Sequence, residues 1–159
     1  MKRTSFVSGY TLVEVLVGML IVTFMFIGGY TAYREFIRRQ ALDSTAETLK
    51  TNLTLARQKA ISSEKPFPCS SDTLVGYEVS FTNNSYTVSP DCLTINPGYS
   101  YDSTYNLPAT ITLSISNFTS PLLYKSVSGT NLSVNGTITL THSAGGSKVV
   151  TITPQGIVQ

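Results

Sequence analysis

The sequence predicts an α+β fold in which one long N-terminal helix packs against an antiparallel β-sheet head. Three observations lead to this prediction. An apolar run with one ionisable group occupies residues 10–33, an amphipathic helical pattern follows over residues 34–64, and short alternating strand patterns fill residues 65–159. The charges are divided in the same way, because eleven of them fall in residues 31–65 and only six in residues 66–159.

The composition excludes several classes of protein. Charged residues make up 13% of the 159-residue chain, about half the share usual in soluble domains, and hydrophobic residues make up 42%. Disorder requires low hydrophobicity together with high net charge, so a disordered chain is excluded. A net charge of +2 gives no bulk electrostatic argument for nucleic-acid binding. Since only one long apolar run is present, a multi-span membrane protein is also excluded.

Residues 10–33 are long enough to cross a membrane as a helix. At about 1.5 Å per residue they span about 36 Å, against about 30 Å for the hydrocarbon core of a bilayer. A cleaved secretory signal would be shorter and would end in an A-x-A-like site, which is absent here. A plain signal anchor is the simple alternative, with Lys2 and Arg3 holding the N-terminus in the cytoplasm. Because basic residues also follow the run, charge alone leaves the topology open.

Glu14 is the one carboxylate inside this apolar run. Such a group costs about 2.5–3.5 kcal/mol near the centre of a bilayer and less near its edge, so a partner is expected. No Lys or Arg lies within a helical turn of it inside the run. If the chain were cut between Gly9 and Tyr10, the new α-amino group would lie four residues before Glu14 and could meet it on one helix face. The amine of a neighbouring copy could serve equally well.

The segment Ser8-Gly9-Tyr10-Thr11-Leu12-Val13-Glu14-Val15-Leu16-Val17 resembles the processing motif of type IV pilins and type II secretion pseudopilins. The resemblance implies that prepilin peptidase cuts after Gly9 and then N-methylates Tyr10. It further implies that Glu14 neutralises the amine of the adjacent subunit as that subunit enters a growing filament. The first mature residue of the family is more often Phe, so Tyr10 is a mild departure.

Beyond the apolar run, a helical period marks one face of an amphipathic stem. The apolar residues recur at steps of 4, 3, 4, 3 and 4 and are Leu42, Ala46, Leu49, Leu53, Ala56 and Ala60. Pro66 and Pro68 stop the pattern, which predicts one helix from about Tyr10 to about Ser62. The basic residues of the stem are interpreted as a solvated face, with Arg34, Arg38 and Arg39 beside lipid headgroups, rather than as a nucleic-acid surface.

The remaining residues predict an antiparallel sheet whose apolar face covers the stem. Strands are expected at 77–82 and 86–88 around an Asn83-Asn84 turn, and at 111–115. Asn135-Gly136 predicts a hairpin that joins 132–134 to 137–140. Gly145-Gly146 separates that hairpin from a strand at 149–152, and Pro154-Gln155-Gly156 turns the chain into Ile157 and Val158. Residues 89–109, with Tyr99, Tyr101 and Tyr105, are expected to form a long loop.

A weaker resemblance extends into the stem and head. The run 49–61 contains Leu53-x-x-Ala56-Arg57-x-x-Ala60, which resembles the helix of the H-type minor pseudopilins and their type IV pilus counterparts. Heads of that subfamily also tend to close with a Gly-containing hairpin, as residues 153–158 would.

Cys69 and Cys92 are the only cysteines, and both fall in the segment expected outside the membrane. An oxidising setting favours a disulfide, which would close a loop of about 24 residues and be worth about 3 kcal/mol. Two cysteines and the distant His142 do not make a metal site. No nucleophile motif accompanies His142, so neither a catalytic site nor a cofactor is expected.

We therefore expect a structural subunit with a leader at residues 1–9, a transmembrane and filament-core helix at 10–33, a stem at 34–64 and a head at 65–159. The resemblance implies a single-pass membrane protein with its head outside the cytoplasm, which then enters an extracytoplasmic filament. Its implied partners are prepilin peptidase, other pilin or pseudopilin subunits and the inner-membrane assembly platform. A type II secretion pseudopilus and a type IV or competence pilus both fit this expectation.

Two alternatives to this interpretation remain. One is a minor or tip pilin that binds DNA or a surface, although residues 66–159 carry two lysines against four acidic residues, which disfavours phosphate contact. The other is a membrane-anchored exported domain with no role in a filament.

Overall fold

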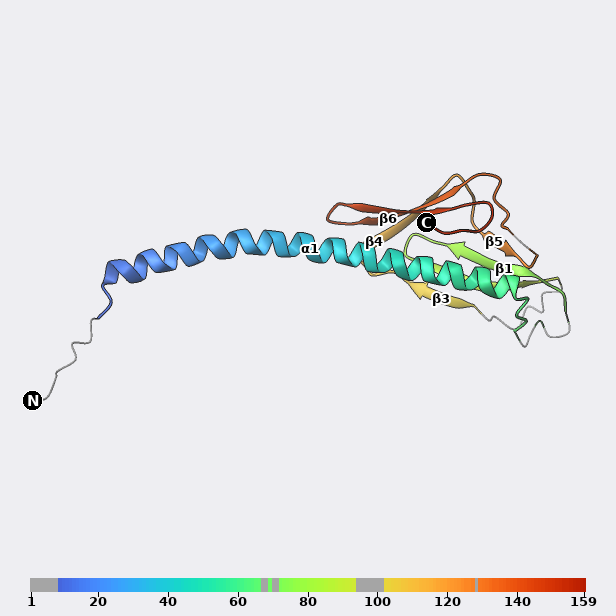
Figure 1. Cartoon of the computed structure of the whole chain (residues 1–159), viewed down its shortest axis with the longest axis horizontal. Helices are drawn as coiled ribbons and strands as arrows, with labels where there is room; N and C mark the ends of the chain where they lie inside the picture. Colours follow the sequence, from blue (N-terminus) through green and yellow to red (C-terminus); the bar gives the residue numbers. More distant parts are fainter. Residues whose placement is uncertain (1–8, 67–68, 70–71, 94–101, 128) are drawn as a thin grey trace, which may run out of the picture. The chain divides into compact units, whose positions relative to one another are not determined.

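The computed structural model describes residues 9–66, 69, 72–93, 102–127 and 129–159 (Figure 1). The leader predicted at residues 1–9 lies outside this part except for Gly9, as do Tyr99, Tyr101 and Pro68. The elements in chain order are α1 (Leu12–Ile61), β1 (Leu74–Phe81), β2 (Ser85–Cys92), β3 (Ser103–Asn106), β4 (Ile111–Ser116), β5 (Leu122–Lys125), β6 (Gly136–His142) and β7 (Ser147–Ile152). The chain divides into two compact units, Met1–Ile37 and Arg38–Gln159.

The long helix is confirmed, and its end is set by backbone hydrogen bonds rather than by the prolines. Ser63 adopts a positive φ of 51°, and its N–H donates to the carbonyl of Ala60 at 3.1 Å. The N–H of Glu64 donates to the carbonyl of Lys59, also at 3.1 Å. This pair of bonds is the Schellman arrangement, which satisfies carbonyls that the last helical turn leaves without partners. Pro66 lies beyond the completed cap.

The part of α1 that belongs to the first unit exposes its apolar side chains. The helix contains a stretch long and apolar enough to cross a membrane. Large hydrophobic side chains are exposed from Leu12 to Phe26 and again at Tyr30, Tyr33 and Phe36. A helix that is apolar on all sides is typical of a segment surrounded by lipid or by other helices.

In the second unit, the predicted stripe forms the helix side of the core. All six of its residues are buried, with at most 5% of any side chain exposed, and these are Leu42, Ala46, Leu49, Leu53, Ala56 and Ala60. Leu55, which lies outside the stripe on the same helix, is 43% exposed. The spacing of the stripe therefore predicted which face of the stem packs against the head.

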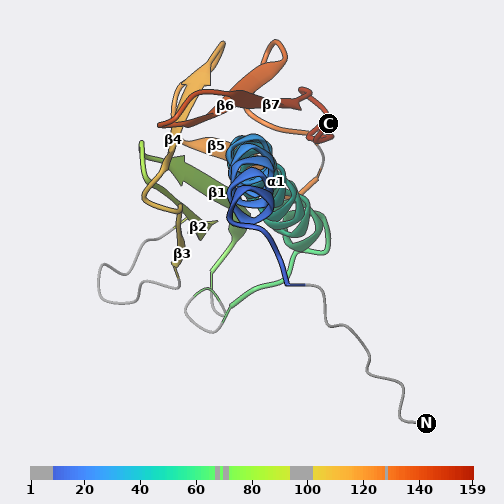
Figure 2. The same ribbon diagram turned by 90° about the vertical axis from the view of Figure 1, so that its left-hand side faces the viewer.

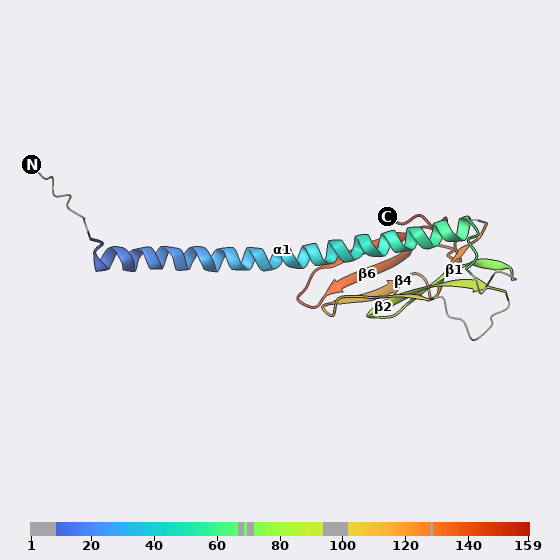
Figure 3. The same ribbon diagram turned by 90° about the horizontal axis from the view of Figure 1, so that it is seen from below.

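The antiparallel head is confirmed, but it consists of two sheets rather than one. A four-stranded sheet has the order β3-β2-β1-β5, and a three-stranded sheet has the order β4-β6-β7. Figure 2 shows residues 38–61 of α1 in the angle between the two sheets, and Figure 3 shows β1, β2, β4 and β6 along one side of that segment. The chain leaves the first sheet after β3 to form β4, and returns to it as β5 beside β1.

Three sequence predictions within the head need correction. Residues 132–134 form no strand, and β6 begins at Gly136 and pairs with β4 and β7. Gly136 serves close packing instead of a turn, because a β-carbon there would lie 2.7 Å from the Phe118 ring. The loop expected at 89–109 contains the end of β2 and all of β3, and the sequence reading did not find β5. By contrast, Gly145 and Gly146 separate two strands as predicted, and the structure shows that both adopt positive φ in the β6–β7 turn.

Two buried tyrosines of the head differ in their hydrogen bonding. The Tyr86 hydroxyl accepts a hydrogen bond from Asn52 of the helix at 2.7 Å. The Tyr124 side chain is fully buried, and its hydroxyl has no hydrogen-bond partner among the described residues. Burial raises the pKa of Tyr124 far above its ordinary value, so this hydroxyl is protonated at any physiological pH.

This difference predicts opposite effects of two matched substitutions. Tyr124→Phe removes a buried hydroxyl without breaking a bond, so the free energy of unfolding should stay the same or rise. Tyr86→Phe leaves the Asn52 side chain without its hydrogen-bond partner and should lower the free energy of unfolding by about 1–2 kcal/mol. Urea unfolding of the detergent-solubilised chain measures both. A loss of more than about 1 kcal/mol in Tyr124→Phe would contradict the assignment.

Candidate processing and assembly site

The residues of the predicted cleavage site lie at the start of α1. Gly9 and Tyr10 precede the helix, both are exposed, and the Tyr10 side chain is 83% exposed. A β-carbon built at Gly9 meets no atom within 4 Å, so no contact in the structure requires a glycine there. A peptide bond in an exposed segment outside regular secondary structure is accessible to a protease.

Thr11 caps the helix immediately after this segment. Its Oγ1 accepts a hydrogen bond from the backbone N–H of Glu14 at 3.2 Å. Thr11-Leu12-Val13-Glu14 has the sequence of a capping box, in which a Thr three residues before a Glu marks a helix start. This role of Thr11 was not predicted from the sequence, although the T-x-x-E spacing indicates it.

Glu14 lies in the first turn, where the helix dipole favours a negative charge. Its carboxylate has neither an ion-pair nor a hydrogen-bond partner within the described part of the chain. The backbone N–H of Glu14 serves the cap while its side chain remains available. A substitution at Glu14 therefore changes the charge and leaves the cap intact.

The β6–β7 hairpin fastens the head to the helix at the beginning of the second unit. Arg38 donates a hydrogen bond to the carbonyl of Ala144, and Lys148 forms an ion pair with Asp43 at 2.7 Å. The hydrogen bond to Asp43 and its charge raise the pKa of Lys148. Gly146 lies against Leu42, where a β-carbon would be 3.5 Å from the Leu42 side chain. Arg38, which we expected beside headgroups, thus has a contact in the head.

Cys69 and Cys92 form the predicted disulfide, with their Cα atoms 6.1 Å apart. Cys69 is buried in the connection between α1 and β1, and Cys92 is the last residue of β2. The N–H of Leu93 donates to the carbonyl of Thr73 at 3.0 Å beside the bridge. The disulfide therefore fixes the chain that leaves the helix to the first β-hairpin.

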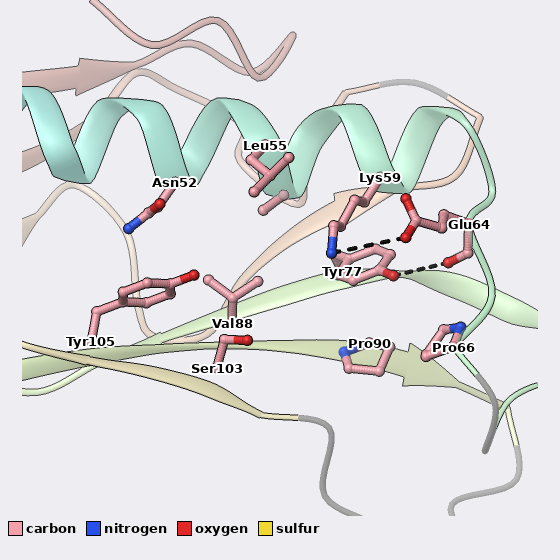
Figure 4. A pocket seen from close by; sticks show the side chains of 11 residues that line it. Asn52, Leu55, Lys59, Glu64, Pro66, Tyr77, Val88, Pro90, Ser103 and Tyr105 are labelled. Atoms are coloured by element: carbon pink, nitrogen blue, oxygen red, sulfur yellow. Dashed lines mark hydrogen bonds and ion pairs between the residues drawn. The ribbon is translucent and has the colours of Figure 1, made fainter.

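A groove of about 290 Å³ lies between the end of α1 and the β2–β3 edge of the larger sheet (Figure 4). Its charged lining residues, Lys59 and Glu64, pair with each other at 3.9 Å. The Tyr77 hydroxyl donates to the backbone carbonyl of Glu64 at 2.9 Å, and burial followed by the Glu64 charge raises the Tyr77 pKa. Since these groups are engaged with one another, the groove presents no arranged nucleophile and base.

The family comparison matches most of the stem and all but the last three residues of the head. A family model described as "Type II transport protein GspH" matches residues 45–156. The match begins within the buried stripe of α1 and ends at the C-terminal turn. It does not include Gly9, Tyr10 or Glu14, so the comparison does not test these three positions. No curated protein matches the chain.

A solved structure shares the fold. The type IV minor pilin FimU of Pseudomonas aeruginosa matches with a TM-score of 0.56 and 16% sequence identity, over 78% of this chain and 90% of that chain. At this level of identity the match shows a common architecture of a long N-terminal helix and a β-sheet head.

The Cys69–Cys92 disulfide is expected to stabilise the folded chain. The double substitution Cys69→Ala and Cys92→Ala should lower the free energy of unfolding by about 2–4 kcal/mol, because the bridge restricts a loop of about 24 residues in the unfolded chain. Urea unfolding of the oxidised wild type and the double variant measures this difference. Wild-type stability in the double variant would show that the bridge contributes nothing.

Proposed function

Because this chain belongs to the GspH family of type II transport proteins, we propose that it is a minor structural subunit of a pseudopilus or type IV pilus-like filament. The observation that carries this proposal is the pairing of two features in one chain. A head of the GspH family covers one half of the helix, and an exposed apolar half with a lone carboxylate near its start remains for assembly.

The proposal assigns a role to each residue at the start of the helix. Prepilin peptidase cuts the exposed bond after Gly9, and the new N-terminus at Tyr10 becomes N-methylated. While the subunit is in the membrane, the head lies outside the cytoplasm. Filament growth then moves the apolar helix from lipid into a bundle of like helices, where the Glu14 carboxylate pairs with the amine of a neighbouring subunit. The Ser- and Thr-rich head forms part of the filament surface.

Glu14 provides the test of assembly. Glu14→Leu should reduce incorporation into sheared filaments at least tenfold, because an amine left unpaired in an apolar bundle costs on the order of 3–5 kcal/mol. Quantitative immunoblotting of filament and membrane fractions measures incorporation at matched expression. Thr11→Ala is the control, since it weakens the helix cap but keeps the charge, and it should assemble nearly normally. Equal incorporation of Glu14→Leu and wild type would remove the proposed role.

Gly9 provides the test of processing. Gly9→Leu should leave the uncut precursor in the membrane, because the motif places a Gly before the cut while the fold has open space at Gly9. Intact-mass measurement should find wild-type protein beginning at methylated Tyr10 and the variant retaining its first nine residues. Tyr10→Phe keeps an aromatic first residue and serves as the processed control. A wild-type chain that keeps Met1 would favour a membrane-anchored domain outside any filament.

A further inference from the structure

The apolar half of α1 carries a notch at Gly29. The side chains around this glycine border a shallow, open space of about 330 Å³, and they belong to Met25, Phe26, Tyr30 and Tyr33. A β-carbon built at Gly29 meets no atom within 4 Å, so the space above the glycine is open. The surrounding side chains are all more than 60% exposed. A molecule that filled the notch would therefore bury apolar and aromatic surface of these side chains.

A positive charge lies at the C-terminal end of the notch. The guanidinium of Arg34 is over the ring of Tyr30, 5.8 Å from its centroid. Arg34 is exposed and has no hydrogen-bond or ion-pair partner among the described residues. A cation–π contact uses none of the guanidinium N–H groups as a hydrogen-bond donor, so these donors remain available to a ligand. Those donors match the oxygens of a phosphate, which arginine binds in a bidentate manner.

The depth of this site in a bilayer follows from the length of the helix. From Leu12 to Tyr33 the helix rises about 32 Å, close to the thickness of about 30 Å of a hydrocarbon core. In a membrane-spanning helix, Tyr30 and Arg34 would thus lie at the level of the headgroups, where aromatic and basic residues are enriched. The part of the notch formed by Met25, Phe26 and Gly29 would lie below them, at the level of the acyl chains.

We propose that the notch and Arg34 bind one anionic phospholipid, with an acyl chain against Gly29 and the headgroup phosphate on the guanidinium. The inference rests on the proposed function, since it describes the subunit in the membrane before assembly. Copies anchored in one bilayer hold Arg34 at the same depth. A second helix in the notch would therefore bring two guanidiniums together, which disfavours a second copy as the occupant.

The test uses the full chain in phosphatidylcholine vesicles that contain a lipid with a photoreactive acyl chain. The lipid is either phosphatidylglycerol or phosphatidylcholine, at equal mole fraction and with the same chain. Peptide mass spectrometry locates the attached lipid. Labelling between Met25 and Tyr33 should be about fivefold greater with phosphatidylglycerol, the preference that one basic side chain provides at anionic lipid. Equal labelling by the two lipids would overturn the assignment of the headgroup.

Two pairs of variants separate this site from general attraction to the membrane. Arg34→Gln should abolish the preference for phosphatidylglycerol, whereas Arg39→Gln, which removes the same charge five residues later, should retain it. Gly29→Leu fills the notch and should suppress labelling there with either lipid. Gly18→Leu places the same side chain at another open glycine and should not. Equal effects within either pair would overturn the proposal.

A second copy of the chain is the alternative occupant of the notch, and a cysteine variant tests it directly. A Gly29→Cys chain that formed a disulfide-linked dimer in the vesicles in high yield would place a second copy in the notch and overturn the lipid assignment, whereas a monomer supports it. None of these measurements needs the peptidase or a filament. A failure of lipid labelling would therefore leave the assembly role intact, and a failure of cleavage or incorporation would leave the labelling result intact.

Discussion

Burial of one apolar stripe on the helix is the interaction on which the folded head depends. The stripe runs from Leu42 to Ala60, and both sheets pack around it. Neither a four-stranded nor a three-stranded sheet has a second layer of its own, so each needs the helix to cover its apolar face. The stripe combines leucines at Leu42, Leu49 and Leu53 with alanines at Ala46, Ala56 and Ala60, and all six are buried in the core of the head.

The features that depend on local sequence were predictable, and those that depend on distant contacts were not. The helix and its stripe follow from a short period, and the β6–β7 turn follows from two glycines that accept positive φ. β3 and β5 contain four residues each, too few for a clear alternation, and they form because β2 and β1 offer them edges. The hairpin predicted at Asn135-Gly136 was wrong for the same reason, since Gly136 is needed mainly for its close contact with the distant Phe118 ring.

The candidate site shows the same division. Gly9, Tyr10 and Glu14 could be predicted because they belong to one short motif of neighbouring residues. The T-x-x-E pattern of the Thr11 cap lies in the same motif. The contacts of Arg38 and Asp43 with the β6–β7 hairpin join residues more than 100 positions apart, so no local pattern could indicate them. Likewise, the notch at Gly29 becomes apparent only when side chains one helical turn away are placed around it.

The position of the β6–β7 hairpin near the end of the chain also determines when the head can fold during synthesis. Ile138, Leu140, Val150 and Ile152 are fully buried and come from the last 22 residues of the chain. During synthesis the helix emerges first, and its stripe remains uncovered until these strands have followed it. A chain stopped about two dozen residues early would lack β6 and β7 and leave part of the stripe exposed to solvent. Synthesis must therefore reach β7 before the core of the head is complete, so the last strands of the chain decide when the head can fold.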